Sequence, residues 1–207
     1  MWYCIVVTVL VGYMLGNLNG AVCISALMHD DVRSHGSGNA GLTNFVRNYG
    51  AGRAIYVLMI DAGKAALSCV AGGLLLQQYA SFDMGAAIGG LAVMLGHVFP
   101  ALLGGKGGKG ILSGLFVALV TDWRIALIIL AVFAIAYFTT QYVSLGSVLA
   151  AVAFGIGFGV FHYNEPVVMV CGIAMSVLAV YMHRSNIVRL IKGQESKTNL
   201  FAKKRAE

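Results

Sequence analysis

The sequence predicts an all-α integral membrane protein with seven transmembrane helices. Of its 207 residues, 59% are hydrophobic and 11% are charged, and the mean hydropathy is +0.83. Soluble domains carry about 25% charged residues, so this chain lacks the polar surface that water requires. The apolar residues fall into seven runs, and nearly all of the cations lie in or beside alternate connecting segments. These three observations favour a helical bundle in a bilayer.

The apolar runs define the expected helices. They cover residues 3–25, 54–79, 84–103, 110–121, 124–140, 145–162 and 166–183. A span needs about 20 apolar residues, so the fourth run is short. The first run has no preceding Lys or Arg and no small-residue cleavage pattern after it, which indicates a retained helix and not a signal peptide. The connecting segments are too short for a soluble domain, and residues 1–207 are expected to form one domain.

The cations predict the orientation. All of the 14 Lys and Arg residues except Arg124 lie on the side of the C-terminal tail or in the second run. They are Arg33, Arg47, Arg53, Lys64, Lys106, Lys109, Arg184, Arg189, Lys192, Lys197, Lys203, Lys204 and Arg205. The positive-inside rule then puts the C-terminus in the cytoplasm and the N-terminus outside. Because the cations sit at the ends of apolar runs and not along a polar stripe, no nucleic-acid partner is expected. Lys203, Lys204 and Arg205 are expected to anchor the tail to lipid headgroups.

The first cytoplasmic segment is rich in small and polar residues. It reads Ser37-Gly38-Asn39-Ala40-Gly41-Leu42-Thr43-Asn44, and Arg47 follows. Glycines let a backbone approach a ligand, and successive N–H groups form nests for anions. Arg47 adds a planar donor fork suited to phosphate. A flexible polar loop explains the same composition equally well.

Asp61 and Lys64 interrupt the second apolar run. Their i,i+3 spacing puts them on one helix face. A charge at membrane depth is costly, and such residues usually face an internal cavity and have a function. Two interpretations remain: an ion pair that fixes helix packing, or an Asp61 that orients Lys64 towards an anion.

The most specific local signal is the segment 104–110, with five glycines and with Lys106 and Lys109. This composition favours a phosphate cradle, and the short run after it predicts a helix N-terminus pointing at the anion. A Walker A motif is excluded because Gly110 stands where Ser or Thr is required. A basic stop-transfer loop is the simpler alternative. Upstream, His97 is either a structural hydrogen-bonding residue or a ligand, and Pro100 predicts a kink.

The end of the seventh run places His183, Asn186 and Arg189 at i, i+3 and i+6, and Glu195 follows. His183 and Asn186 share a face if the helix continues. A basic tail on anionic lipid is the alternative. Ser144, in the turn 142–147, either faces the same pocket or caps a helix. The sequence has no cluster with metal-ligand spacing and neither a GxSxG nor an HxxxxD motif, so no metal and no cofactor are expected.

Taken together, these motifs resemble the bacterial acyl-phosphate-dependent glycerol-3-phosphate acyltransferases, small seven-helix membrane enzymes of phospholipid synthesis. The resemblance covers the whole chain. Some residues depart from the usual pattern: Ala40 for Pro, Leu42 for Ala, Ala65 for Gly, Gly105 for Phe, Ile111-Leu112-Ser113 for Val-Ala-Thr and Gln141 for Arg. Because the anion-binding groups of the three main motifs remain, the activity is expected to be retained. The loss of the usual Pro and Phe is expected to alter loop rigidity or acyl-chain fit.

The resemblance implies acyl transfer from acyl phosphate to glycerol 3-phosphate, giving lysophosphatidate and inorganic phosphate, on the cytoplasmic face of the bacterial cytoplasmic membrane. It implies membrane lipid and the two substrates as partners, and coupling with an acyl-phosphate-forming enzyme. The expected catalytic residues are Ser37, Arg47, Lys106, His183 and Asn186. The expected phosphate- and substrate-binding residues are Gly38, Asn39, Gly41, Thr43, Asn44, Asp61, Lys64, His97, Gly107, Gly108, Lys109, Gly110, Ser144, Arg189 and Glu195.

For the proton of the attacking hydroxyl, the leaving phosphate is the preferred acceptor, and His183 as general base is the rival. The main alternative function is a transporter for a phosphate-bearing anion, in which broken helices also point at an anion. A transporter needs a site that both sides can reach, and the outer loops here are short and poor in polar ligands. A lipid-binding scaffold is a weaker alternative, because it does not need His183, Asn186 and the glycine segments together.

Overall fold

The computed structural model describes residues 1–197, and all of the regular elements in this range are helices, as predicted. The α-helices are α1 (Trp2–Gly16), α2 (Gly20–Ala26), α3 (Leu42–Tyr49), α4 (Ala51–Leu76), α5 (Phe82–Val98), α6 (Ile111–Thr121), α7 (Trp123–Thr140), α8 (Val143–Phe161), α9 (Pro166–Met182) and α10 (Arg184–Ile191). Two 3₁₀ turns, η1 (Val32–Ser34) and η2 (Ala101–Leu103), lie in the loops. The tail anchors predicted at Lys203, Lys204 and Arg205 lie outside the described residues.

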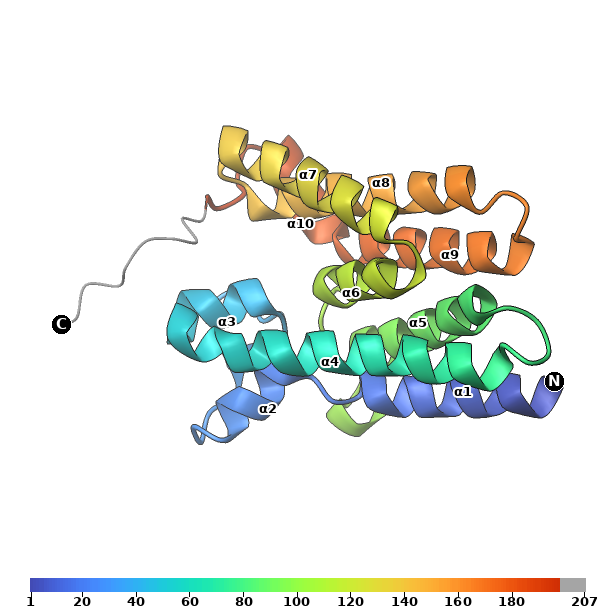
Figure 1. Ribbon diagram of the computed structural model, residues 1–207. Helices are drawn as coiled ribbons and strands as arrows, with labels where there is room; N and C mark the ends of the chain where they lie inside the picture. The colour runs from blue at the N-terminus through green and yellow to red at the C-terminus, as the bar shows by residue number, and fades with distance from the viewer. Residues whose placement is uncertain (198–207) are drawn as a thin grey trace.

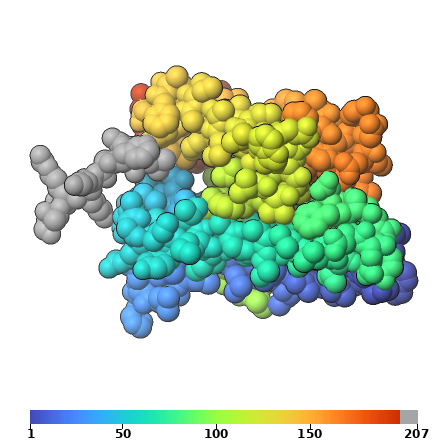
Figure 2. Space-filling view, in the orientation of Figure 1, coloured from blue at the N-terminus to red at the C-terminus, as the bar shows by residue number. Residues whose placement is uncertain are grey.

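The helices form two halves that meet along α6. Helices α1, α4 and α5 pack together with α2 and α3 beside α4, while α7, α8 and α9 form the other half (Figure 1). Helix α6 contacts α4, α5, α7 and α8. Figure 2 shows its yellow-green surface between the blue-green half and the yellow-orange half. The core between the halves includes Met94, Val117, Phe158 and Met175.

Glycines allow the helices of the first half to approach closely. A Cβ on Gly85 would lie 2.1 Å from the carbonyl oxygen of Gly72, and one on Gly96 would lie 2.2 Å from that of Tyr13. Helices in lipid associate through such small-residue contacts, because hydrocarbon supplies no hydrophobic driving force between them. The glycines of α4 and α5 therefore set the geometry of the half that carries the first loop.

The first apolar run does not form one straight helix. α1 and α2 meet at an angle of 41°, with a break between Gly16 and Gly20. The Asn19 side chain accepts a hydrogen bond from Val22 N and so caps α2. The Lys64 ammonium donates to the freed carbonyl oxygens of Gly16 and Leu18, at 3.3 Å and 2.5 Å. The break thus replaces lost helical hydrogen bonds with side-chain partners.

The described residues contain four helices that are individually long and apolar enough to cross a bilayer, or six if each bent helix pair is one span. The four are Ala51–Leu76, Phe82–Leu103, Trp123–Thr140 and Val143–Phe161. The 11 residues of α6 cover about 16 Å, roughly half of a 30 Å hydrocarbon core. The structure is therefore a multi-pass helical membrane fold, whereas the count of seven spans and the orientation stay predictions.

Candidate functional site

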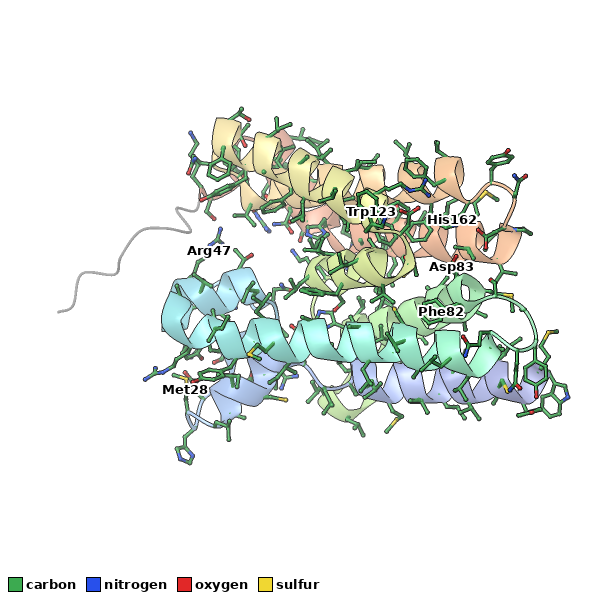
Figure 3. The ribbon with its side chains drawn as sticks, in the orientation of Figure 1. Met28, Arg47, Phe82, Asp83, Trp123 and His162 are labelled. Carbon is green, nitrogen blue, oxygen red and sulfur yellow. The ribbon has the colours of Figure 1, made fainter. Side chains whose placement is uncertain are left out.

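Four segments far apart in the sequence gather at one end of the bundle. They are the first loop (residues 27–41), the glycine loop (residues 104–110), the turn between α7 and α8, and the junction of α9 and α10. Arg47 on α3 points towards the half that carries α7, α8 and α10 (Figure 3). We call this end the glycine-loop end.

The glycine loop folds back onto the end of α5. Gly108 N donates to the carbonyl oxygen of His97 at 3.0 Å. A Cβ on Gly107 would lie 1.9 Å from that oxygen, and one on Gly108 would lie 2.2 Å from His97 Nε2. These two glycines are therefore required by packing, whatever the loop binds.

The start of α6 confirms the predicted helix N-terminus after the glycine loop. Gly110 has a left-handed φ of +83° and precedes the first helical residue, Ile111. Glycine adopts that conformation without steric cost. The N-terminal end of α6 therefore joins the glycine loop directly, as an anion site of this kind requires.

The two lysines of the glycine loop differ in their surroundings. Lys106 is exposed and makes no hydrogen bond or ion pair with a described residue. Lys109 is half-buried and donates to Asn186 Oδ1. Burial lowers the pKa of Lys109 to about 8, with further lowering by the positive charges of Arg189, Arg184 and Arg47 against the opposing charge of Glu195. Several cations thus face one another here, an arrangement that an anion would relieve.

Glu195 holds Asn186 and Arg189 in place. Its Oε1 accepts from Asn186 Nδ2 at 2.9 Å, and its Oε2 accepts from Arg189 Nε at 2.7 Å. Burial alone would raise the pKa of Glu195, but the hydrogen bonds from Asn186 and Arg189 outweigh it, and the pKa is lowered. Ser144 of α8 is buried, and its Oγ has no hydrogen-bond partner among the described residues. A carboxylate engaged in this way is suited to orienting the cation and the amide, and not to touching a phosphate.

His183 lies where α9 and α10 meet at 54°. The helix therefore bends between His183 and Asn186, yet both side chains are buried. His183 Nδ1 lies 2.8 Å from the carbonyl oxygen of Ala179 and must donate to it. In the neutral ring, Nε2 then carries the lone pair and can accept a proton or a hydrogen bond.

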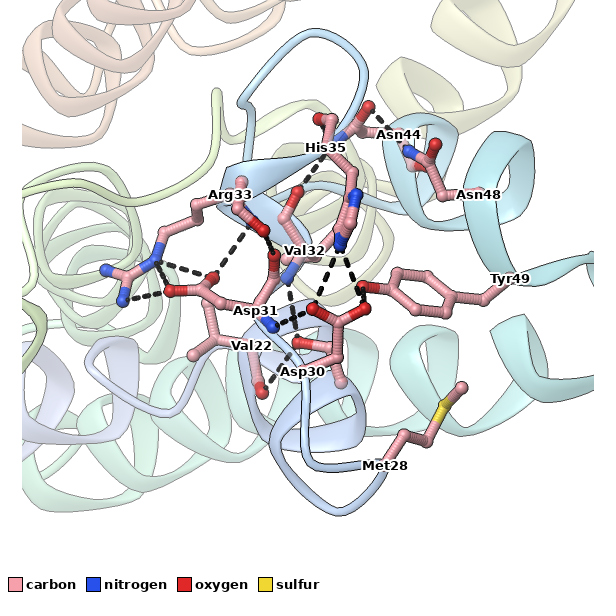
Figure 4. Close-up of polar contacts among 12 residues, drawn as sticks. Val22, Met28, Asp30, Asp31, Val32, Arg33, His35, Asn44, Asn48 and Tyr49 are labelled. Carbon is pink, nitrogen blue, oxygen red and sulfur yellow. Dashed lines mark hydrogen bonds and ion pairs between the residues drawn. The ribbon is translucent and has the colours of Figure 1, made fainter.

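In the first loop, Asn44 is part of the loop's own framework. Its Oδ1 accepts from Ser37 N at 3.0 Å, and its Nδ2 donates to the carbonyl oxygens of Val32 and His35, both at 3.0 Å (Figure 4). Asn44 thereby fixes the loop beside Ser37. Gly38, with a φ of +69°, and Ser37 are exposed, whereas Asn39, Gly41 and Thr43 are partly buried.

The buried pair of Asp61 and Lys64 joins three helices. Lys64 Nζ lies 2.8 Å from both Asp61 Oδ1 and His97 Nδ1, besides its bonds to the carbonyls at the α1–α2 break. Asp61 Oδ1 also accepts from Gly20 N at 3.1 Å. Since the lysine's donors are taken by protein acceptors, this geometry favours the helix-fixing interpretation over a phosphate contact.

Three polar residues that the sequence did not single out hold the segment before the glycine loop. Tyr13 OH donates to Phe99 O at 2.8 Å and accepts from Ala101 N at 3.2 Å. Asn17 Oδ1 accepts from Leu102 N at 3.0 Å. The third residue is Arg33, whose Nη1 donates to the carbonyl oxygen of Leu103 at 2.9 Å. The one signal for Tyr13 and Asn17 was the presence of polar groups in an apolar run.

Two apolar hollows adjoin this end. A cavity of about 30 Å³ between α6, α8 and α9 is bordered by Gly110, Phe154, Met175 and Ala179. An open groove of about 540 Å³ runs along α8 and α9 past Gly155, Ile173 and Tyr181. Ser176 borders both, and its hydroxyl donates to Ala151 O at 2.7 Å.

Comparison with known proteins gives consistent results. The family model described as glycerol-3-phosphate acyltransferase matches residues 6–193. A glycerol-3-phosphate acyltransferase of Prochlorococcus marinus strain MIT 9215 is 36% identical over 94% of this chain and 98% of its own length. One from Finegoldia magna is 37% identical over 91% of this chain and 93% of its own.

Two solved structures share the fold. The crystal structure of PlsY (YgiH), an integral membrane glycerol 3-phosphate acyltransferase, superimposes in its glycerol 3-phosphate form with a TM-score of 0.85. The sequence identity is 31%, over 94% of this chain and 96% of that one. The lysophosphatidic acid form gives a TM-score of 0.81 at 30% identity, over 95% and 96%.

Proposed function

Because the chain belongs to the glycerol-3-phosphate acyltransferase family, we propose that it acylates the 1-hydroxyl of glycerol 3-phosphate with acyl phosphate as the donor. The products are lysophosphatidate and inorganic phosphate, in the first acylation of phospholipid synthesis. The single domain 1–207 carries the whole site. The observation that carries the proposal is the crowding of cations around the glycine loop, beside His183 and Asn186.

Both substrates are phosphate esters or anhydrides, so the site must hold two anions. Lys106 and Arg47 are the cations best placed to meet phosphate, and Lys109 adds a third charge while it positions Asn186. Donors fixed before the reaction stabilise developing charge without further reorganisation. His183 and Asn186 orient glycerol 3-phosphate, and Ser37 polarises the acyl carbonyl. Lys64 and His97 act by holding the loop and do not touch substrate.

The reaction exchanges one acyl–oxygen bond for another. The 1-hydroxyl oxygen attacks the acyl carbon, the bond from that carbon to the phosphate oxygen breaks, and phosphate leaves. The hydroxyl proton passes to the leaving phosphate, directly or through His183. Positioning alone supplies much of the rate for so reactive a donor. The acceptor nitrogen Nε2 of His183 fits a hydrogen bond from the attacking hydroxyl in either route.

The acyl chain lies in the groove along α8 and α9, with its reacting end near the α9–α10 junction. This placement is supported by the apolar lining past Ile173 and by the small residue Gly155, where a Cβ would clash with Ser176 at 2.6 Å. The 30 Å³ cavity is too small for a chain without side-chain movement, since it has the volume of about one water molecule.

The protein resides in the bacterial cytoplasmic membrane with this site on the cytoplasmic face, where an acyl-phosphate-forming enzyme supplies the donor. The excess of cations at the glycine-loop end supports this orientation through the positive-inside rule. A transporter is disfavoured, because a transporter needs a site that both sides of the membrane can reach. The site residues of this protein lie together at one end of the bundle.

The test is an assay of the purified protein with glycerol 3-phosphate and either palmitoyl phosphate or palmitoyl-CoA. Lysophosphatidate is expected with palmitoyl phosphate, together with equimolar inorganic phosphate. Product with palmitoyl-CoA alone would refute the donor assignment, and no product with either would refute the activity. In the same assay, His183→Gln keeps a polar group and removes the base. A fall in kcat of about 10⁴-fold or more with substrate binding intact, which is the full effect that one acid–base group usually supplies, would exclude the direct route.

A further inference from the structure

We propose that Arg33 is a positioning residue that fixes the glycine loop against the first loop. The proposal rests on the function proposed above and adds a residue to its machinery. Arg33 lies in η1, between the first apolar run and Ser37, and Leu103 is the last residue of η2 before the glycine loop.

The guanidinium of Arg33 connects the two loops through all three of its nitrogens. Nη1 donates to the carbonyl oxygen of Leu103 at 2.9 Å. Nε and Nη2 donate to the carboxylate of Asp31, at 3.0 Å and 2.9 Å for the shortest contacts (Figure 4). Asp31 Oδ1 also accepts from Arg33 N at 2.9 Å and so caps η1. Asp31 therefore orients the guanidinium of Arg33, and the remaining nitrogen, Nη1, holds the residue that precedes the glycine loop.

A second contact joins the same two loops. The carbonyl oxygen of Ala40 accepts from Asn19 Nδ2 at 3.0 Å, and a Cβ on Gly108 would lie 2.9 Å from that oxygen. The glycine loop thus contacts the first loop at Gly108, close to where the glycine loop joins α6. Arg33 holds the other end of the glycine loop, at Leu103. Between the two contacts stands Lys106.

The residues between Leu103 and Lys106 are held only through their backbone, by hydrogen bonds from Gly104 N to Ala101 O at 3.3 Å and from Gly105 N to Pro100 O at 2.9 Å. Gly104 and Gly105 have left-handed φ values of +68° and +73°, and a Cβ on either would meet nothing within 4 Å. Lys106 is exposed. Its position therefore depends on how the backbone on either side is held, by Gly108 N on His97 O after it and by the η2 segment that ends at Leu103 before it. A displacement of about 1 Å in a positioning group can cost 10²-fold in rate.

Two other roles for Arg33 lead to different results. If Arg33 served only as a positive charge that attracts substrate, lysine would replace it. If Arg33 bound phosphate directly, loss of Asp31 would leave activity intact or increase it. A lysine carries its donors on one nitrogen, so it cannot form the two-nitrogen fork that Nε and Nη2 of Arg33 make with Asp31 while a separate nitrogen reaches Leu103.

The experiment compares Arg33→Gln, Arg33→Lys and Asp31→Asn with the wild type in the palmitoyl phosphate assay. The control is Arg53→Gln, which removes the same charge from an exposed residue of α4. Nη1 of Arg53 lies 3.9 Å from Met28 Sδ. We expect kcat/KM to fall about 10–100-fold in all three test variants and to stay within twofold of the wild type in the control. The asparagine of Asp31→Asn keeps the η1 cap, so this variant is expected to fold even if Arg33→Gln does not.

Backbone hydrogen exchange gives a readout that general destabilisation does not mimic. Exchange is expected to accelerate at residues 103–110 in the test variants and to stay unchanged in α7 and α8. Wild-type activity in Arg33→Lys, or in Asp31→Asn, would overturn the positioning role, and so would equal acceleration throughout the protein. If the wild type itself forms no product, the proposed function fails, while hydrogen exchange still decides whether Arg33 holds the loop.

Discussion

The two ends of the bundle both carry clusters of charge, but they use it differently. At the end opposite the glycine loop, Asp122 Oδ1 accepts from Arg124 N at 3.0 Å and from its Nε at 2.9 Å, and Asp122 Oδ2 accepts from Nη2 at 2.7 Å. His162 Nδ1 lies 3.0 Å from Glu165 Oε1, and its Nε2 lies 3.4 Å from Asp122 Oδ2. Arg124 also stacks over the Phe161 ring at 4.4 Å.

At the opposite end, Arg124 is thus paired with Asp122, and His162 with Glu165. They link the α6–α7 turn to the α8–α9 turn, near Asp83 at the start of α5 (Figure 3). At the glycine-loop end, where Asp30 and Asp31 are engaged with His35 and Arg33 inside the first loop, the carboxylate of Glu195 lies among the cations Lys109, Arg184 and Arg189. Matched charges stabilise a structure modestly, whereas unmatched charges of one sign need a ligand. The comparison predicts that substitutions separate into activity effects at one end and stability effects at the other.

The largest effect is expected from Lys106→Met. This change removes an exposed ammonium from the glycine loop and keeps the length of the side chain. We expect kcat/KM for glycerol 3-phosphate to fall about 10²–10³-fold, the usual cost of losing one preorganised donor. Unfolding in detergent should shift by less than about 0.5 kcal/mol, as for most surface substitutions. Unchanged kinetics would remove Lys106 from the site.

A smaller effect is expected from pH, through Lys109. Its lowered pKa of about 8 means that the ammonium loses its proton as the pH rises from 7 to 9. At pH 9 roughly a tenth of the free enzyme keeps this charge, so KM for glycerol 3-phosphate should rise about tenfold. Lys109→Arg stays charged over the whole range, because the guanidinium does not titrate.

Rates of the two proteins, measured from pH 7 to 9 and corrected for donor hydrolysis in buffer, check this assignment. The wild type should lose affinity with rising pH, and Lys109→Arg should show a flat profile at a lower rate. The same decline in both proteins would assign the titration to another group.

Much of this fold could be predicted because apolar run length and helix period depend on local sequence. The start of α6 followed from Gly110 and the short run after it. The break between α1 and α2 could not be predicted, since the freed carbonyls of Gly16 and Leu18 are satisfied by Lys64 from another helix. Its cause is tertiary, and only the asparagines at positions 17 and 19 indicated it.

The candidate site shows the same division. The family resemblance placed Asn186 among the expected catalytic residues and Lys109, Arg189 and Glu195 among the expected binding residues, and the structure joins all four by hydrogen bonds. Individual roles depended on partners that the sequence does not show. Asn44, which was expected to bind substrate, uses its amide within the first loop, a role that the sequence did not indicate. Binding by the residues of the site stays a prediction until substrate is tested.

The smallest effect on activity is expected at the opposite end, from Asp122→Asn and Asp122→Ala. The hydrogen bonds from Arg124 hold the pKa of Asp122 below its usual value, so its ionised form stabilises the fold at neutral pH. A lowered pKa means that this contribution is present above about pH 4 and is lost as the pH falls through the folded-state pKa. Asparagine keeps the α7 cap that Asp122 supplies to Arg124 N, and alanine loses it.

Thermal unfolding should therefore rank the wild type above Asp122→Asn, and Asp122→Ala lowest, by about 1 kcal/mol for the lost cap. The difference between the wild type and Asp122→Asn should begin to shrink as the pH falls below about 4 and should vanish once the pH is below the lowered folded-state pKa, because the wild-type carboxylate is then neutral. Activity should stay within twofold in both variants at 25 °C. A tenfold loss of kcat/KM in Asp122→Asn, with unfolding unchanged, would mean that the opposite end takes part in the reaction. The contrast between a matched and an unmatched end would then be wrong as an account of where the protein acts.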